Sequence, residues 1–321
     1  MPDFDGFSIE WQAPEAMFEA AVYNLLSTET DIRASRLLCH RVPVQYPGPK
    51  LSVPKDLAGC RLFVFEKAKG VDNVWRELSD IDKMRLLDQL ADIRAALFHY
   101  NTPSDFIQSR LLSRIYNFMP ETLTQPIAPT RDMIGWEDDN KTVGPIALAA
   151  KESLLRALPH LMPPETADKS LYRLTLEHED FGNTTPQLKS PKRRVAAASP
   201  LSLPIFDWET GCIVPALLSD PLVAVNPVDL TAKEDGDATV TGIPKDATQS
   251  DMKIYFGWAG HYIQRLYNKT PEYKVAIQAG KDIRYLWFKL RDWRGGDSER
   301  FFGGLGKWAE KRMRELGVDV D

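Results

Sequence analysis

Apolar residues recur at helical spacing in the N-terminal third of the chain. A first helix is predicted over residues 14–26, where Pro14 suits the first turn and apolar residues follow at helical intervals. The pattern Ser79-x-x-Asp82 is typical of a capped helix start. An apolar face then continues through Phe98, so a second helix is predicted from this cap.

The last third of the chain is predicted to be mostly helical. Two apolar stripes recur every three or four positions, and we interpret them as core rather than as a ligand cage: Ile254, Trp258, Tyr262 and Leu266, then Ile283, Leu286, Trp287, Leu290 and Trp293. A helix over residues 146–158 precedes them, and a final helix over residues 299–316 ends at Gly317 as a C-terminal cap.

Shorter β-rich runs predict strands at residues 36–44, 61–66 and 171–176. The run Leu62–Phe65 has the composition of a central strand. Polar, proline-rich or irregular composition predicts surface loops at residues 119–145 and 187–202, and residues 106–118 fit a helix or an extended segment equally well.

Composition narrows the class of protein. With 43% hydrophobic and 26% charged residues among 321, the chain resembles soluble globular proteins. Its net charge of −5 gives no basic footprint for a nucleic acid, so we expect no nucleic-acid partner. No apolar run approaches the roughly 20 residues of a membrane helix. The first residues lack a signal-peptide pattern, so we expect no membrane association and a cytoplasmic location.

Three cysteines and five histidines are scattered along the chain. Cys39, Cys60 and Cys212 form no disulfide-type spacing, and we interpret them as buried free thiols. Because no histidine lies near a cysteine pair, a zinc site is not expected.

Two acids follow two apolar runs in the middle of the chain. The run ending at Leu176 leads into His178-Glu-Asp180, and a second short run leads into Asp207-Trp-Glu209. A phosphotransferase needs one carboxylate to accept the proton of the attacking hydroxyl and another to hold Mg²⁺. Asp180 suits the first role and Asp207 the second, whereas His178 is expected to pack beneath the loop.

These blocks resemble the aminoglycoside phosphotransferase and choline kinase-like family, in particular its fungal branch. The resemblance extends over roughly residues 15–316 and rests on His178–Gly182, Asp207–Glu209, Ser219–Pro221, Leu286–Gly295 and Phe302–Trp308. It implies an α+β, two-lobed protein-kinase-like fold. A reduced N-terminal lobe would take residues 1–69, and a mainly helical C-terminal lobe residues 70–321.

The resemblance also implies roles for residues outside the acid motifs. The backbone of Glu66, Lys67 and Ala68 would form the hinge that meets an adenine. Glu19, on the first helix, would pair with a phosphate-binding lysine, and Glu209 is assigned to the substrate. Mg²⁺ and ATP are the implied cofactors if the chain is a kinase, and otherwise none is implied.

Three departures from the family pattern bear on activity. Thr185 stands where the family has a metal-binding Asn, and Asn183 could replace it only if the loop is remodelled. Before the first predicted helix there is one glycine, Gly6, instead of a Gly-rich hairpin. The first lysine is Lys50, so Glu19 has no upstream lysine to pair with. A native short start and a truncated gene model both fit the last two departures.

Three functions fit these residues. The first is a repurposed enzyme or binder that holds a small molecule in the interlobe cleft, with Asp180 as acid or base. We place it slightly ahead because the phosphate-handling parts are incomplete. The second is a Mg²⁺- and ATP-dependent kinase of a small hydroxyl or amine, with Thr185 or Asn183 completing the metal site and an arginine replacing the lysine. The third is a non-catalytic pseudokinase whose long loops bind partners. Substrate and oligomeric state stay open.

Overall fold

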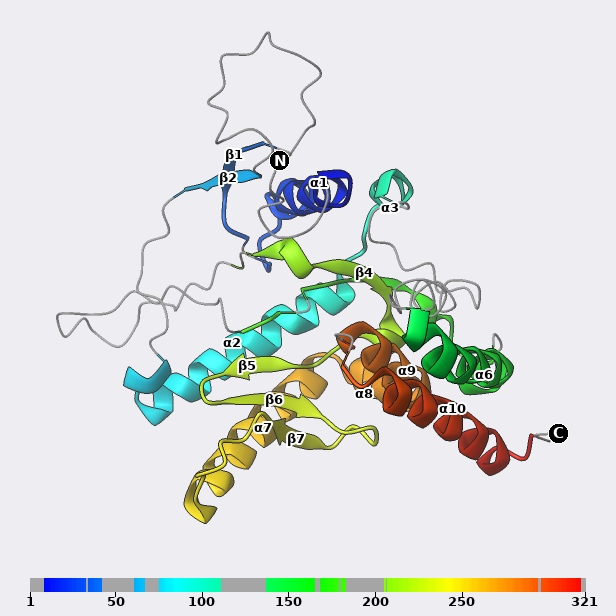
Figure 1. The fold of residues 1–321 in the computed structure, drawn as a ribbon. Coiled ribbons are helices and arrows are strands. Elements are labelled where there is room, and N and C mark those ends of the chain that lie inside the picture. Colours follow the sequence, from blue (N-terminus) through cyan, green and yellow to red (C-terminus); the bar gives the residue numbers. More distant parts are fainter. Residues whose placement is uncertain are drawn as a thin grey trace, which may run out of the picture.

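Helices and antiparallel sheets alternate along the chain, so the mixed helix and sheet content is as predicted (Figure 1). The computed structural model describes residues 9–32, 34–41, 61–66, 75–110, 137–164, 168–178, 180–182, 205, 207–293 and 296–318. Within those ranges, no helix combines the length and the apolar character needed to cross a membrane.

The N-terminal elements are helix α1 (Ile9–Leu26) and a two-stranded antiparallel sheet, β1 (Leu37–Arg41) and β2 (Leu62–Phe65). The helix begins at Ile9 rather than in the turn of Pro14, because the residues before the proline include good helix formers. It contacts β1, and Figure 1 shows the three elements together at one end of the molecule.

Two predictions for this part of the chain were wrong. β2 is not a central strand but half of a two-stranded sheet, and Leu62 and Val64 on its outer face are exposed. Cys39 is exposed on β1, whereas Cys212 is buried as expected, and Cys60 lies outside the described residues. The boundary predicted between residues 69 and 70 also lies outside them and stays a prediction.

Helix α2 (Asp80–His99) follows the predicted cap closely. The Ser79 side chain accepts a hydrogen bond from the backbone N–H of Asp82, which satisfies one of the free donors in the first turn. The predicted apolar face of α2 is buried against α7 (Gln249–Lys269). Helix α3 (Ser104–Arg110) shows that the start of the undecided segment is helical.

The middle of the chain forms two small antiparallel sheets, of which the first has two strands. β3 (Leu174–Glu177) pairs with β4 (Cys212–Pro215), and three short 3-10 helices flank them: η2 (Lys169–Tyr172), η3 (Trp208–Thr210) and η4 (Ala216–Leu218). The predicted strand over 171–176 therefore begins only at Leu174, since η2 occupies the residues before it.

A three-stranded sheet follows that the sequence analysis missed. Its strands are β5 (Val223–Val225), β6 (Val228–Ala232) and β7 (Ala238–Thr241). The strands hold three to five residues each, too few for a clear alternating pattern in a segment taken as helical. Figure 1 shows this sheet beside α7, which contacts β6 and β7.

The remaining helices form the C-terminal part of the core: α6 (Glu137–Leu161), α8 (Pro271–Ala279), α9 (Lys281–Asp292) and α10 (Ser298–Glu315). α6 packs along α10 (Figure 1) and begins at Glu137, so residues 137–145 are helical rather than part of a surface loop. Most of the predicted stripes are buried, but Ile254 is exposed. Gly317 has a φ of +73° and caps α10 as predicted.

A buried ion pair joins α2 to β3 inside this core. Arg94 Nη1 lies 2.6 Å from Glu177 Oε2, with side-chain exposures of 1% and 4%. Arg94 Nη2 donates to the carbonyl of Leu222 at 2.8 Å, and the guanidinium lies 4.6 Å from the Phe181 ring centre. Burial opposes the charge on Arg94, but the Glu177 carboxylate holds the pKa of Arg94 above its usual value.

Replacing Arg94 with Met should destabilise the protein by about 3–5 kcal/mol, because it leaves the Glu177 carboxylate buried beside an apolar side chain. Urea denaturation followed by circular dichroism measures this change. The double variant Arg94→Met with Glu177→Leu should recover part of the loss, since it removes both charges.

Arg85→Met is the matched control, because Arg85 pairs with Asp82 at 3.3 Å on the exposed side of the same helix. It should cost less than about 1 kcal/mol. An Arg94→Met variant as stable as this control would show that the buried pair does not hold α2 to β3.

Candidate functional site

The His-x-Asp loop directly follows β3 and is anchored by buried aromatic rings. The His178 ring is 1% exposed and lies 4.6 Å from the Trp208 ring and 5.9 Å from the Phe181 ring, measured between centroids. Phe181 is fully buried, with Arg94 over its ring. Asp180, between these anchors, is exposed. The loop thus presents a carboxylate to solvent from a rigid base.

Gly182 fixes the other end of this loop against β5. The backbone N–H of Ala224 donates to the Phe181 carbonyl at 3.0 Å. Gly182 has a φ of +129°, and a Cβ there would lie 2.3 Å from the Ala224 carbonyl oxygen. Both the backbone angle and the close approach require glycine at this position.

Asp207 lies at the start of η3 and is tied to α1. It adopts a left-handed backbone conformation with a φ of 66°. Its backbone N–H donates to the Tyr23 hydroxyl oxygen at 2.7 Å. Burial, and then the nearby Glu19 carboxylate, raise the pKa of Tyr23. Glu19 is 6% exposed on the same helix, so this acid lies near the backbone support of Asp207.

The carboxylates predicted from the two motifs influence one another. Burial, followed by the charges of Glu209 and Asp180, raises the pKa of Asp207, and Arg61 opposes the rise. Burial and then Asp180 also raise the pKa of Asp229 on β6. Asp180 thus acts electrostatically on both Asp207 and Asp229, and Glu209 acts on Asp207; these four carboxylates are called the acidic cluster below.

Asp229 and Arg61 were missed by the sequence analysis. Arg61, at the start of β2, forms an ion pair with Glu209 across 148 sequence positions. No sequence signal connects these two residues. Asp229 could have been found from alternation, because its neighbours Val228 and Leu230 are buried while Asp229 and Thr231 face the other side of β6.

The remaining predicted site residues are only partly described. The backbone N–H of Glu66 donates to the Arg36 carbonyl at 2.9 Å, so this hinge donor is used by the β1–β2 pair. The Glu66 side chain is exposed, 3.6 Å from Arg36. Lys67, Ala68, Asn183 and Thr185 lie outside the described residues.

A metal site is not complete within the described part of the chain. No group of three or more His, Cys, Asp or Glu side chains there is arranged to hold an ion. Carboxylate oxygens are the ligands that Mg²⁺ prefers, and Asp207 lies among like charges that a cation would neutralise. Asp207 therefore fits Mg²⁺ chemically, but further ligands are needed beyond those described.

Comparisons with known proteins give weak similarity. No family model matches the sequence, and no curated protein matches it. Among solved structures, the GDP complex of wild-type aminoglycoside 2′-phosphotransferase-IIIa shares 13% identity at a TM-score of 0.40, covering 94% of this chain and 83% of that one. The GDP complex of a point mutant of that enzyme shares 15% identity at 0.38, covering 94% and 82%.

Both structural neighbours are aminoglycoside phosphotransferases, the family that the sequence motifs resemble. At these identities and TM-scores the comparison decides neither the fold nor the activity. Those assignments depend on the residues of this chain.

Asp207→Asn should stabilise the protein at neutral pH, and the gain should disappear in acid. Because the pKa of Asp207 is raised in the folded state, folding penalises the charged form, and this penalty is absent below the unfolded value of about 3.9. Melting temperatures measured from pH 3.5 to 8 should therefore diverge as the pH rises. Asp246→Asn, at an exposed turn, is the control and should show no divergence. A constant offset would contradict the acidic cluster and indicate only the preference of Asn for the left-handed conformation.

Gly182→Ala should destabilise the protein by at least about 1–3 kcal/mol, because the new methyl group meets the Ala224 backbone at a strained angle. Gly304→Ala is the matched control. Gly304 lies in α10 with nothing within 4 Å of an added Cβ, so this change should stabilise by about 0.5–1 kcal/mol. Chemical denaturation of both variants checks the pair, and an equally stable Gly182→Ala would contradict the docking of the loop on β5.

Proposed function

We propose that this chain is a protein-kinase-like enzyme that transfers a phosphoryl group from a magnesium nucleotide to a small molecule with a hydroxyl or amine. The observation that carries the proposal is that Asp180 follows β3 and Asp207 precedes β4, its antiparallel partner, so both acids lie beyond the same end of this strand pair. Arg61 pairs with Glu209 of the same Asp-Trp-Glu block. This is the arrangement of charges that phosphoryl transfer requires. In this proposal α1, β1 and β2 belong to the smaller lobe, and the boundary falls between residues 69 and 70.

Asp180 is the proposed base. It is exposed at the tip of an anchored loop, where an incoming hydroxyl can reach it. Accepting or aligning the hydroxyl proton prepares the oxygen for attack on a phosphorus atom. His178 supports the loop through its ring contacts and is a positioning residue in this scheme.

Asp207 is the proposed metal-facing carboxylate. Mg²⁺ would supply the positive charge that offsets the nucleotide phosphates. Asn183 and Thr185 are the proposed remaining ligands from this chain. Asp207 is held for this role through its backbone by Tyr23, so α1 positions it.

Arg61 is the proposed phosphate-binding cation. The sequence placed a repurposed enzyme slightly ahead because two phosphate-handling parts of the family pattern were not found while the acid motifs were intact. Arg61 supplies a cation at the Asp-Trp-Glu block from β2, and its pairing with Glu209 orients it there. A guanidinium is always charged and can bind phosphate oxygens in pairs. This contact favours the phosphotransferase over the repurposed enzyme. In this proposal Glu209 positions Arg61 rather than the substrate.

A second candidate is acid–base chemistry on a small molecule without phosphoryl transfer. The raised pKa values of Asp207 and Asp229 favour it, because carboxyl groups that keep protons longer can act as general acids. Asp180 would remain the acid or base. The cytoplasmic location and the small-molecule partner are part of both proposals, and the pseudokinase has no specific support from the described residues.

Millimolar Mg-ATP or Mg-GTP should raise the melting temperature of the protein, because a ligand that binds only the native state stabilises it. EDTA should abolish the rise. Arg61→Gln should weaken nucleotide affinity at least about tenfold, which is the loss of one charge-assisted contact. Asp180→Asn should keep the thermal shift but lose the slow hydrolysis of nucleotide by water.

Arg36→Gln is the matched control, since Arg36 lies near the same small sheet but its side chain is exposed and pairs with Glu66. It should leave nucleotide affinity within about twofold of wild type. If neither nucleotide shifts the melting temperature, the phosphotransferase proposal is wrong and the acid–base candidate replaces it.

A further inference from the structure

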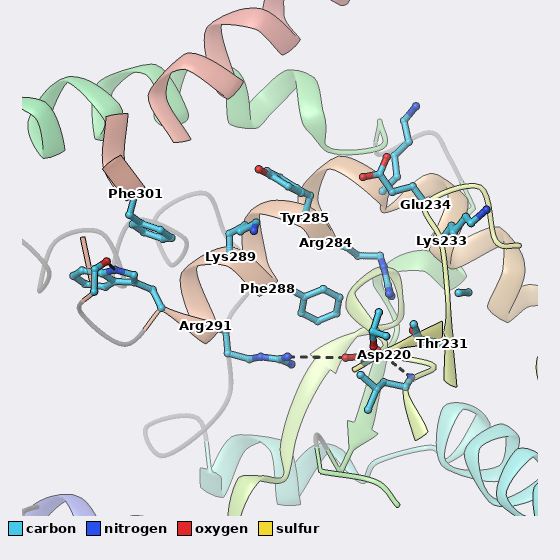
Figure 2. A pocket seen from close by; sticks show the side chains of 16 residues that line it. Asp220, Thr231, Lys233, Glu234, Arg284, Tyr285, Phe288, Lys289, Arg291 and Phe301 are labelled. Atoms are coloured by element: carbon cyan, nitrogen blue, oxygen red, sulfur yellow. Dashed lines mark hydrogen bonds and ion pairs between the residues drawn. The ribbon is translucent and has the colours of Figure 1, made fainter. Parts of the chain in front are cut away.

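A pocket lies between α9 and the β5–β7 sheet. Its volume is about 700 Å³, within the range of small-molecule sites. Figure 2 shows Arg284 and Phe288 of α9 on the side that faces Asp220 and Thr231. Tyr285 of the same helix also lines the pocket. Trp293 and Phe301 close one end of the pocket. A ligand here would meet aromatic rings as well as charges.

The described residues that line this pocket carry more positive than negative charge. The basic side chains are Lys233, Lys281, Arg284, Lys289 and Arg291, and the acidic ones are Asp220 and Glu234. Positive charges gathered in one concave site attract an anion and repel a cation. The excess of positive charge in this pocket therefore favours an anionic ligand.

Arg284 is the buried cation of this group. The residue is 7% exposed, and its Nη1 atom is buried without a hydrogen-bond partner. Within the described ranges, no carboxylate lies within ion-pair distance of it. Its guanidinium lies 5.1 Å from the centre of the Phe288 ring, which also supports Arg291 at 4.6 Å. A buried charge without an acid is costly unless a ligand supplies the counter-charge.

Arg291, in contrast, already has an acid. It lies 4.0 Å from Asp220, whose other carboxylate oxygen accepts the backbone N–H of Leu222. Asp220 is thus held by the sheet and by Arg291, and Figure 2 shows both contacts as dashed lines. Two guanidinium groups share one ring while one aspartate balances only one of them, so the uncompensated charge is at Arg284.

We propose that this pocket binds a small organic anion, with its carboxylate or phosphate on Arg284 and its apolar or aromatic body against Phe288 and Tyr285. A guanidinium binds both anionic groups through paired hydrogen bonds. The lysines at the rim, Lys233 and Lys289, attract the anion without fixing its orientation. Binding here does not require a nucleotide, so the proposal is independent of phosphoryl transfer.

The pocket shares one face of the sheet with the acidic cluster. Asp229 and Thr231 lie on the same side of β6, about 7 Å apart along the strand, and Thr231 lines the pocket. Thr241, which also lines it, is the cross-strand partner of Asp229. The acidic cluster and the positively charged pocket are therefore neighbours. The acidic end repels an anion, so the anionic group is directed toward Arg284.

Isothermal titration calorimetry on the full chain with matched probes tests the proposal. Phenyl phosphate and phenylacetate carry the two anionic groups, benzyl alcohol is the neutral analogue and benzylamine the cationic one. At least one anion should bind tenfold or more tightly than benzyl alcohol, and benzylamine should bind most weakly. The tighter of the two anions identifies whether the site prefers phosphate or carboxylate.

Arg284→Met should reduce the affinity for the preferred anion at least tenfold. Arg284→Lys, which keeps the charge but not the paired donors, should lose less. Arg300→Met, an exposed arginine on α10, is the control and should change the affinity less than twofold. Thermal melting checks folding, and Arg284→Met should melt no lower than Arg284→Lys because it removes a buried charge. Two outcomes overturn the proposal: anions that bind no more tightly than benzyl alcohol, or variants of Arg284 that bind them as the wild type does.

Discussion

The buried pair of Arg94 and Glu177 is the contact on which the described site depends. It joins the longest N-terminal core helix, α2, to the strand that ends at the His-x-Asp loop. The same guanidinium covers the Phe181 ring and binds the Leu222 carbonyl, just before β5. One side chain therefore positions the base of the His-x-Asp loop and the start of the three-stranded sheet. The charge tolerates complete burial because its hydrogen bonds and the carboxylate replace water.

A second set of contacts connects the N-terminal elements to the Asp-Trp-Glu block. The Tyr23 hydroxyl of α1 accepts the backbone N–H of Asp207, and Arg61, just before β2, pairs with Glu209. The Ser35 N–H donates to the Ile205 carbonyl at 2.8 Å. These contacts come from three segments before residue 70 and meet within a few residues of one another. A displacement of α1 or β2 would therefore move the acidic cluster.

Opposite charges gather at neighbouring places on the molecule. Asp180, Asp207 and Asp229 repel one another, while Arg284 and the lysines near it form a positive pocket beyond Thr231. The short strand β6 spans both regions, since alternate residues on one face belong to each. A cation is favoured at one end and an anion at the other. The proposed cation site and the proposed anion site therefore lie on one sheet face without attracting the same ligand.

The sequence by itself determined the parts that depend on local pattern. The cap at Ser79, the apolar face of α2 and the end of α10 at Gly317 follow from neighbouring residues, and all three are present. The acid motifs at Asp180 and Asp207 could also be recognised in the sequence, because each follows a short apolar run. The folded chain alone brings Arg61 to Glu209 and Asp229 within the electrostatic influence of Asp180. It also buries Arg284 in a pocket where its Nη1 atom has no hydrogen-bond partner. These arrangements depend on contacts between segments that are distant in the sequence. They also depend on burial, because a charge that is buried in the fold loses the water that would otherwise solvate it. Periodicity along a chain carries neither kind of information.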